Sequence, residues 1–343
     1  MKKKLNVGLV GMGKMGILHG GILCSMDSVV PVAVADTETM LHSFAKSILP
    51  QMNFYKDYRE MLEKERLDLV YITVPTVLHP PIAEACVEKG IPFFVEKPLG
   101  ISCEQCVPLI RKLREKPVIN MVGYVLHFQD VVRKARAIVQ SGVLGEPIHL
   151  KSYMYVTQTL SKSGGTKYKK SVMGGGVLNV VATHLVDILV WLFGDIAQVQ
   201  GSVKSYHSHE VEDFAHSYLR FRSGLEGYLD TSWSLRGYRL PEIKIEVEAE
   251  KGRLILTEDY VKLFLDASGR WESFFKQTLY EGVEIDVGGP EFTREDRHMV
   301  DSVLNGKETG LDVLYAYEIQ RVTDAIYRSA QMGQMIEVKN IGA

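Results

Sequence analysis

Three glycines in the spacing GxGxxG, at Gly11, Gly13 and Gly16, could bind the diphosphate of a dinucleotide. In this pattern the first glycine permits a tight turn after a strand, the second lets the diphosphate approach the backbone, and the third lets the next helix pack closely. The amides at the start of that helix would face an anion. We expect Lys14 and Met15, between the glycines, to belong to the same site.

A carboxylate stands where the ribose of such a dinucleotide would lie. Asp36 ends a second apolar run, Val29–Ala35, twenty positions after Gly16. A carboxylate there accepts hydrogen bonds from the ribose hydroxyls and repels a 2′-phosphate. No arginine follows it in Thr37–Thr39. We therefore expect NAD as the cofactor and consider NADP the weaker candidate.

Polar side chains follow three later apolar runs, at the edge where an open parallel sheet binds its ligands. Lys97 comes directly after Glu96 and the run Ile91–Val95. A bound nicotinamide and partial burial would both lower the pKa of this lysine, which could then hold or deprotonate a hydroxyl. The alternative is an ordinary surface lysine. Further candidates are Thr73, Pro75, His79 and Glu96 for the cofactor, and Tyr124 and His127 for a substrate.

His184 is the second candidate for proton transfer. It lies in the apolar stretch Leu178–Phe193, with Asp187 three positions on and nearly on the same helical face. A neutral imidazole could accept a hydroxyl proton near pH 7, although a histidine in a buried helix is often only a core residue. Weaker candidates for substrate contacts are Asn179, Thr183, Trp233 and Arg236.

The apolar periodicity predicts an α/β chain of two domains, because 343 residues exceed one typical core. Residues 1–123 should form a Rossmann-type doubly wound parallel sheet, and residues 124–343 an α+β domain with an open-faced, mostly antiparallel sheet. Strands of the first domain are expected just before Gly11 and at Val29–Ala35, Leu67–Val74, Ile91–Val95 and Val118–Val122, with helices at Ile82–Lys89 and at Glu104–Leu113, the last kinked or shortened by Pro108.

The second domain alternates short strands around one long helix, Leu178–Phe193. Its strands are expected at Val199–Tyr206, His216–Arg222, Leu225–Ser234, Ile243–Ala249, Arg253–Leu256 and Val261–Leu265, with closing helices near Arg294–Leu304 and Asp312–Met332.

Composition excludes several classes of partner. The formal net charge of -2 and the hydrophobic fraction of 46% call for neither a nucleic acid nor a membrane surface. Asn179, His184 and Asp187 would be costly in hydrocarbon, so a buried helix explains their apolar stretch better than a membrane span does. Four cysteines within apolar patterns suit a reducing compartment, and we expect a cytoplasmic protein.

The order of these motifs resembles that of the glucose-fructose oxidoreductase, inositol dehydrogenase and MocA (Gfo/Idh/MocA) family over essentially the whole chain. The motifs are Gly11–Gly16, Pro75–His79, Glu96-Lys97-Pro98, Gly145–Pro147, Gly174–Gly176 and His184–Asp187. The resemblance implies an NAD(P)-dependent dehydrogenase acting on CH–OH groups of sugars, cyclitols or nucleotide-sugars. It places Lys97 and His184 in the active site and suggests a homodimer or homotetramer formed through the open face of the second sheet.

Two positions depart from the family pattern. Many members carry Asp or Asn four residues before the histidine, where this chain has Val180, and Asn where it has Thr76. Either the helix is irregular and Asn179 still reaches the substrate, or the site works with Lys97 and His184 alone. Val180 also keeps open a non-catalytic, NAD-responsive regulatory or binding protein. NAD-assisted glycoside cleavage, suggested by the wider family, is a third reading.

A group of potential metal ligands occurs in the second domain, but alternate side chains of a strand point to opposite faces and cannot all converge. The group comprises His207, His209, Glu210, Glu212, Asp213 and His216. The family's hydride chemistry needs no metal either, so we expect no metal site.

Overall fold

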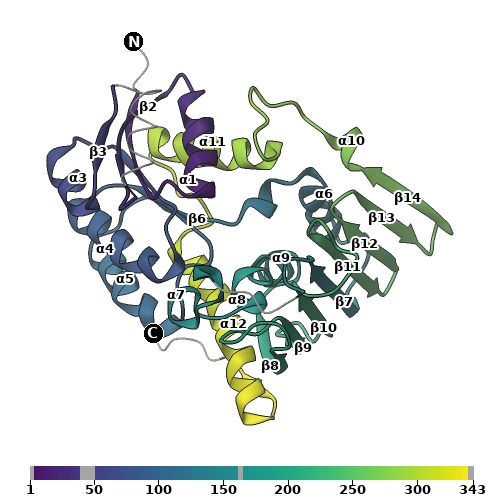
Figure 1. The fold of residues 1–343 in the computed structure, drawn as a ribbon. Coiled ribbons are helices and arrows are strands. Elements are labelled where there is room, and N and C mark those ends of the chain that lie inside the picture. Colours follow the sequence, from purple (N-terminus) through teal and green to yellow (C-terminus); the bar gives the residue numbers. More distant parts are fainter. Residues whose placement is uncertain (1–3, 39–50, 161–164, 339–343) are drawn as a thin grey trace. The chain divides into compact units, whose positions relative to one another are not determined.

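The computed structural model describes residues 4–38, 51–160 and 165–338. Thr39, the last residue of the segment without arginine that follows Asp36, lies outside the described residues. The chain divides into two compact units: Met1–Val125 with Gly282–Tyr317, and Leu126–Glu281 with Glu318–Ala343 (Figure 1). The sequence predicted one boundary, after residue 123. The segment Gly282–Tyr317 instead returns to the first unit, where helix α11 (Pro290–Asn305) contacts α1 (Lys14–Cys24) and buries Met299 and Val300.

Six parallel strands form the sheet of the first unit, in the order β3-β2-β1-β4-β5-β6. Their bounds are β1 Leu5–Val10, β2 Val29–Ala35, β3 Asn53–Tyr55, β4 Leu69–Ile72, β5 Phe93–Glu96 and β6 Asn120–Gly123. This is the predicted doubly wound sheet, and the strand order reverses between β1 and β4. Ligands of such sheets bind at the carboxyl ends of the strands, at that point of reversal.

Helices connect these strands, as right-handed parallel crossovers require. Besides α1, they are α3 Tyr58–Lys64, the short η1 Thr76–Leu78, α4 His79–Lys89 and α5 Cys103–Glu115. The predicted shortening of α5 at Pro108 is wrong, because the helix continues through the proline. Ser102 caps its N-terminus by accepting from the amide of Gln105, and Leu109, Ile110 and Leu113 anchor its buried face.

Nine strands form the sheet of the second unit, antiparallel except for the pair β7 and β10. Their order is β14-β13-β12-β11-β7-β10-β9-β8-β15. Their bounds are β7 Pro147–Tyr155, β8 Ile196–Lys204, β9 Phe214–Phe221, β10 Glu226–Ser232, β11 Glu242–Ala249, β12 Gly252–Thr257, β13 Tyr260–Leu265, β14 Arg270–Phe275 and β15 Ile336–Glu337. One face, including Leu150, Leu229 and Val247, is buried. Helices α6 (Asp130–Gln140), α8 (Val177–Val180) and α9 (Thr183–Phe193) contact this sheet, and the opposite face leaves Tyr228 exposed.

The long helix expected at Leu178–Phe193 is broken into α8 and α9. Taken with the short α7 (Lys170–Met173), the segments Lys170–Val180 and Thr183–Phe193 bend by 49°. Length and composition would let this bent pair cross a membrane, whereas no single helix of the described ranges passes the same test. The chain ends with α12 (Val313–Met332), and α10 (Lys276–Leu279) follows β14.

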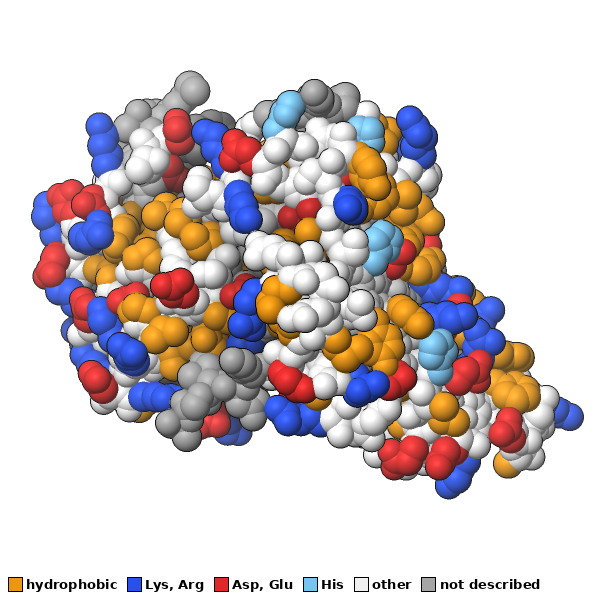
Figure 2. Space-filling model, turned by 90° about the horizontal axis from the view of Figure 1, so that it is seen from below, with side chains coloured by type: hydrophobic (Ala, Val, Ile, Leu, Met, Phe, Trp, Pro, Cys, Tyr) orange, Lys and Arg blue, Asp and Glu red, His pale blue; other side chains and the backbone are white. Residues whose placement is uncertain are grey.

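Charged side chains of both signs are interspersed over the face of the molecule in Figure 2, as the near-zero net charge leads one to expect.

Candidate functional site

The glycine turn joins β1 to α1 and has the geometry that a diphosphate needs. Gly11 has φ +97°, and a Cβ there would lie 2.8 Å from the carbonyl oxygen of Thr73. A Cβ on Gly16 would lie 2.0 Å from the carbonyl oxygen of Gly11. Gly13 differs, because a Cβ there would meet no described protein atom within 4 Å. Gly11 and Gly16 are thus required for packing, whereas Gly13 leaves space beside the backbone.

Gly13 is also the N-cap of α1 and provides no side-chain hydrogen bond to the first turn. The open space and the amides of that turn together fit the diphosphate of a dinucleotide. Thr73 supports the turn from β4, since its hydroxyl donates to the carbonyl oxygens of Gly11 (2.9 Å) and Val10 (3.2 Å). The predicted cofactor residue Thr73 therefore has a defined role in shaping the turn.

Asp36 lies where β2 ends and is bonded to the glycine turn. Its carboxylate accepts from the backbone amides of Met12 (2.5 Å) and Glu38 (2.7 Å). The side chain is half-exposed, so the carboxylate can still accept from a ribose hydroxyl. Its placement beside the turn agrees with the role predicted from its spacing.

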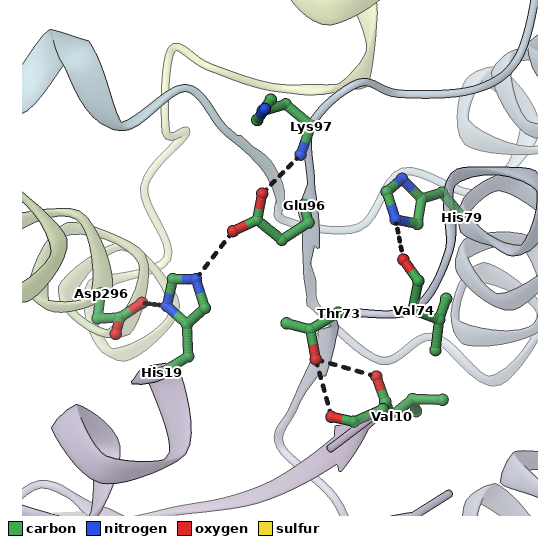
Figure 3. A network of polar contacts seen from close by, with 9 residues as sticks. Val10, His19, Thr73, Val74, His79, Glu96, Lys97 and Asp296 are labelled. Carbon is green, nitrogen blue, oxygen red and sulfur yellow. Dashed lines mark hydrogen bonds and ion pairs between the residues drawn. The ribbon is translucent and has the colours of Figure 1, made fainter. Parts of the chain in front are cut away.

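Glu96 and Lys97 lie at the carboxyl end of β5 (Figure 3). Glu96 is buried, and its Oε2 accepts from the backbone amide of Lys97 at 3.1 Å. Its Oε1 lies 3.1 Å from Nε2 of His19, a residue of α1 that sequence reasoning missed. Burial lowers the pKa of the Lys97 ammonium, and the neighbouring Glu96 opposes this only in part.

His79 bonds to the two loops that follow β4 and β5. Its Nδ1 lies 2.8 Å from the carbonyl oxygen of Pro98, and its Nε2 lies 2.8 Å from that of Val74. Burial lowers the pKa of this imidazole. His79 thus holds the segment after β4, which includes Pro75, against the Glu-Lys-Pro turn after β5. Both ring nitrogens face the backbone, so His79 contributes to the predicted cofactor site by shaping it.

In the second unit, His184 is the partly exposed residue between Thr183 and Leu185, which are buried. Asp187 is paired elsewhere, since its Oδ1 lies 2.8 Å from Nε2 of His127, and both side chains are buried. The His127 ring lies 4.0 Å from the ring of Trp191. His127, predicted to contact substrate, therefore fixes α9, whereas the side chain of His184 is partly exposed.

The break between α8 and α9 does not bring Asn179 to the surface. Its amide nitrogen donates to the carbonyl oxygen of Met173 (2.7 Å), and its Oδ1 accepts from Gln320 (3.2 Å). The side chain is 1% exposed. The irregular helix that one alternative required is present, but Asn179 serves packing within the unit.

Glu212 explains why a glycine, Gly176, precedes α8. A Cβ on Gly176 would lie 1.9 Å from the Glu212 carbonyl oxygen. The Glu212 carboxylate accepts from the amides of Gly176 and Leu178 (2.9 Å each) and from the hydroxyl of Tyr327 (2.8 Å). The carboxylate thereby binds the start of α8, and its oxygens are used for structure.

Several other predicted site residues are occupied in the same way. Asp213 accepts from the amides of Tyr206, His207 and Ser208, and His216 lies 3.0 Å from Asp230, so these two members of the group of potential metal ligands have structural roles. Trp233, a weaker candidate for a substrate contact, is 0% exposed and packs edge-on against Tyr168, so its ring offers no surface to a substrate. Tyr124 is also buried, Thr183 is 1% exposed, and Arg236 is exposed.

Two family models match the chain, one over the sheet of the first unit and one over most of the strands of the second. Residues 5–124 match the model described as "Oxidoreductase family, NAD-binding Rossmann fold". Residues 132–255 match the "GFO/IDH/MocA C-terminal domain". The chain belongs to the Gfo/Idh/MocA family. It is an oxidoreductase, and NAD is the cofactor of its Rossmann domain.

Three relatives of this family member cover 89 to 99% of its length at low identity. The scyllo-inositol 2-dehydrogenase (NAD(+)) of Bacillus subtilis is 25% identical, covering 98% of this chain and 97% of its own. The 2,7-anhydro-N-acetylneuraminate hydratase of Mediterraneibacter gnavus is 22% identical over 89% of this chain and 87% of its own. The structure of levoglucosan dehydrogenase with NADH has a TM-score of 0.90 at 21% identity, covering 99% and 100% of the two chains.

Cofactor choice gives the first prediction for this family member. NAD should bind more tightly than NADP by about tenfold or more, because Asp36 would repel a 2′-phosphate. Fluorescence titration with both reduced cofactors measures the ratio. Asp36→Asn keeps a hydrogen-bond acceptor but removes the negative charge, so it should reduce the preference for NADH over NADPH. Comparable or tighter binding of NADPH by the unaltered protein would contradict the prediction.

Proposed function

We propose that the protein is an NAD-dependent dehydrogenase that moves hydride between the nicotinamide and a secondary alcohol of a sugar, cyclitol or nucleotide-sugar. Bound NAD supplies the hydride acceptor in the oxidative direction. The observation that carries the proposal is Lys97, held at the carboxyl end of β5 with its pKa lowered by burial. Ligands of a doubly wound sheet bind at that edge, beside the glycine turn.

The alcohol must lose a proton as its carbon loses hydride. A neutral Lys97 amine can accept that proton, or its ammonium can hold the alkoxide and later return the proton to a ketone. His184 is the proposed partner in this proton transfer, because its side chain is partly exposed whereas its neighbours Thr183 and Leu185 are buried. Val180 supplies no carboxylate or amide, so the proposal assigns the chemistry to Lys97 and His184 alone.

The test is NADH formation at 340 nm with a panel of anhydrosugars, inositols, aldoses and UDP-sugars, measured alongside NAD binding. Turnover of at least one panel member is expected. NAD binding without turnover of any would favour the non-catalytic regulatory protein. Release of an aglycone from a glycoside without net NADH would identify the cleavage reaction, in which a transient ketone permits elimination. The hydratase among the relatives makes this the second candidate.

We propose in addition a homodimer or homotetramer that forms through the open face of the second sheet. That face carries exposed Tyr228 on β10 and exposed Trp271 and Phe275 on β14. Light scattering after gel filtration should give a mass of two or four chains. Tyr228→Glu should lower it, whereas Tyr206→Glu, outside the strands, should not. A monomeric unaltered protein would contradict this proposal. The cytoplasm is the proposed compartment, because four cysteines within apolar patterns suit a reducing environment.

A further inference from the structure

A buried histidine joins three elements of the first unit. His19 lies on α1, Glu96 ends β5, and Asp296 lies on α11, 277 residues further along the chain. Nδ1 of His19 is 2.8 Å from Oδ1 of Asp296, and Nε2 is 3.1 Å from Oε1 of Glu96. Figure 3 shows the ring between the two carboxylates. His19 and Asp296 have no exposed surface.

The two distances define the charge of the ring. An ionised carboxylate only accepts hydrogen bonds, so a ring nitrogen that faces one donates to it. With Glu96 and Asp296 both ionised, His19 is an imidazolium, although burial raises the pKa of Asp296. Burial is the largest influence on His19 and lowers its pKa, but Asp296 and Glu96 together outweigh burial and hold the pKa of His19 well above its ordinary value. The ring then has no lone pair to offer a metal ion, although Glu295 and Asp296 lie within 4.8 Å of it.

Aromatic rings enclose the imidazolium and keep water away. Their centroids lie 4.9 Å (Phe94), 5.7 Å (Tyr71) and 6.1 Å (Phe292) from that of His19. The titratable groups facing His19 are Glu96 on β5, Tyr71 on β4, and Glu295 and Asp296 on α11. In such a low-dielectric site, a charged hydrogen bond is strong and orients its partners tightly.

Glu96 connects His19 to the Glu-Lys-Pro turn. One carboxylate oxygen faces His19, and the other accepts from the backbone amide of Lys97 at 3.1 Å. We propose that His19 is a positioning residue for Lys97: held by Asp296, it orients and neutralises Glu96, which in turn fixes the start of the Lys97 backbone. The inference rests on the proposed role of Lys97 in proton transfer. It couples the helix that follows the glycine turn to the residue that would move the proton.

Replacing His19 by an uncharged residue should raise the pKa of Lys97. The carboxylate of Glu96 would lose its cationic partner on α1, leaving the Lys97 ammonium as the cation beside it. An opposite charge without compensation favours the charged lysine, so the pKa of Lys97 should rise. The limb of the pH profile that reports a neutral amine would then move to higher pH.

Two substitutions separate positioning from simple packing. The side-chain amide of His19→Gln can reach the position of Nε2 and still donate to Glu96, whereas that of His19→Asn can reach only the position of Nδ1 and donate to Asp296. His19→Asn should lower kcat by about 10- to 100-fold, with the KM for NAD nearly unchanged. His19→Gln should recover part of kcat. His298→Asn is the control, because His298 lies on the same α11 but bonds to the Thr309 carbonyl oxygen.

A second readout needs no substrate. NMR of 13C-labelled lysine side chains in the full chain with NAD bound follows the titration of Lys97, assigned from its loss in Lys97→Arg. Both His19 variants should raise its pKa, and His298→Asn should not. If no panel substrate is turned over, the proposed dehydrogenase fails while this titration still decides whether His19 controls Lys97.

Equal kcat for His19→Asn and His19→Gln, with the Lys97 titration unmoved, would overturn the inference and leave His19 a packing residue. If thermal melting shows that neither variant folds, Asp296→Asn takes their place. This change keeps the ring and its bond to Glu96 but removes one carboxylate, which lowers the pKa of His19. Asp296→Asn should therefore raise the pKa of Lys97, as expected for the His19 variants. An unchanged titration of Lys97 would again reject the proposal.

Discussion

Replacing Lys97 by alanine should lower kcat by about 10²- to 10⁴-fold, the range that a positioned acid or base contributes. NAD affinity should change little, because the proposed contacts of the glycine turn and Asp36 with the dinucleotide do not involve this side chain. Steady-state kinetics on a substrate found in the panel, together with NADH titration, separate the two effects. Lys89→Ala is the matched control, since Lys89 ends α4 in the same unit and pairs with Glu63 on the surface. Near-normal turnover of Lys97→Ala would remove Lys97 from the chemistry.

The pH dependence follows from the same side chain. Proton acceptance needs the neutral amine, and its fraction grows as the pH rises through the pKa. Alcohol oxidation should therefore rise with pH, with a midpoint below 10.5, the ordinary value for lysine. Ketone reduction should fall over the same interval, because it needs the ammonium. Lys97→Arg stays protonated throughout and should lose this limb altogether.

Replacing Gly13 by alanine should weaken NAD binding without unfolding the protein. A Cβ at this position meets no described protein atom, and the φ of -67° suits alanine, so the fold should tolerate the methyl group. The methyl group would occupy the space through which a diphosphate approaches the backbone. An overpacked contact of this kind costs about 1–3 kcal/mol, which weakens binding by roughly 5- to 150-fold.

Gly21→Ala is the matched control, because a Cβ at Gly21, on the same helix α1, also meets nothing within 4 Å among the described residues. Calorimetric titration with NADH and a thermal melt should show weaker binding only for Gly13→Ala, at an unchanged melting temperature. Gly16→Ala should instead lower the melting temperature, since its Cβ would lie 2.0 Å from a carbonyl oxygen. Unchanged affinity in Gly13→Ala would place the diphosphate elsewhere.

The cofactor half of the site could be predicted because its signals are local. Gly11, Gly13 and Gly16 lie within six residues, and Asp36 ends the next strand, so spacing alone places them in one turn and its neighbour. The parallel sheet was predicted for the same reason, since each buried strand is a continuous apolar run.

The partners of His19 could not be predicted in this way. Glu96 and Asp296 are 77 and 277 residues away, and an isolated histidine on an apolar helix gives no sign of either. The break before α9 has a similar origin. Val177–Phe193 keeps helical periodicity throughout, and nothing in it marks residues 181–182 as a break, nor the distant Glu212 as the group that binds the amides of Gly176 and Leu178 at the start of α8.

Two further differences arise from burial. Strand β14 is exposed on most of its residues, so its sequence, including Trp271, lacks the alternation that predicts a strand. Trp233 follows a strand, a position that predicted ligand contact, but its side chain is fully buried and packs against Tyr168. Exposure at a strand end depends on what other segments fold over it.

The return of Gly282–Tyr317 to the first unit has a consequence for biosynthesis. When residues 1–125 have emerged from the ribosome, all six strands of the parallel sheet have been synthesised but α11 has not. Asp296 is then missing, and the buried His19 and Glu96 lack their final partner. The NAD-binding unit can close only after nearly the whole chain has emerged, so a nascent chain stalled before residue 290 should remain sensitive to proteases.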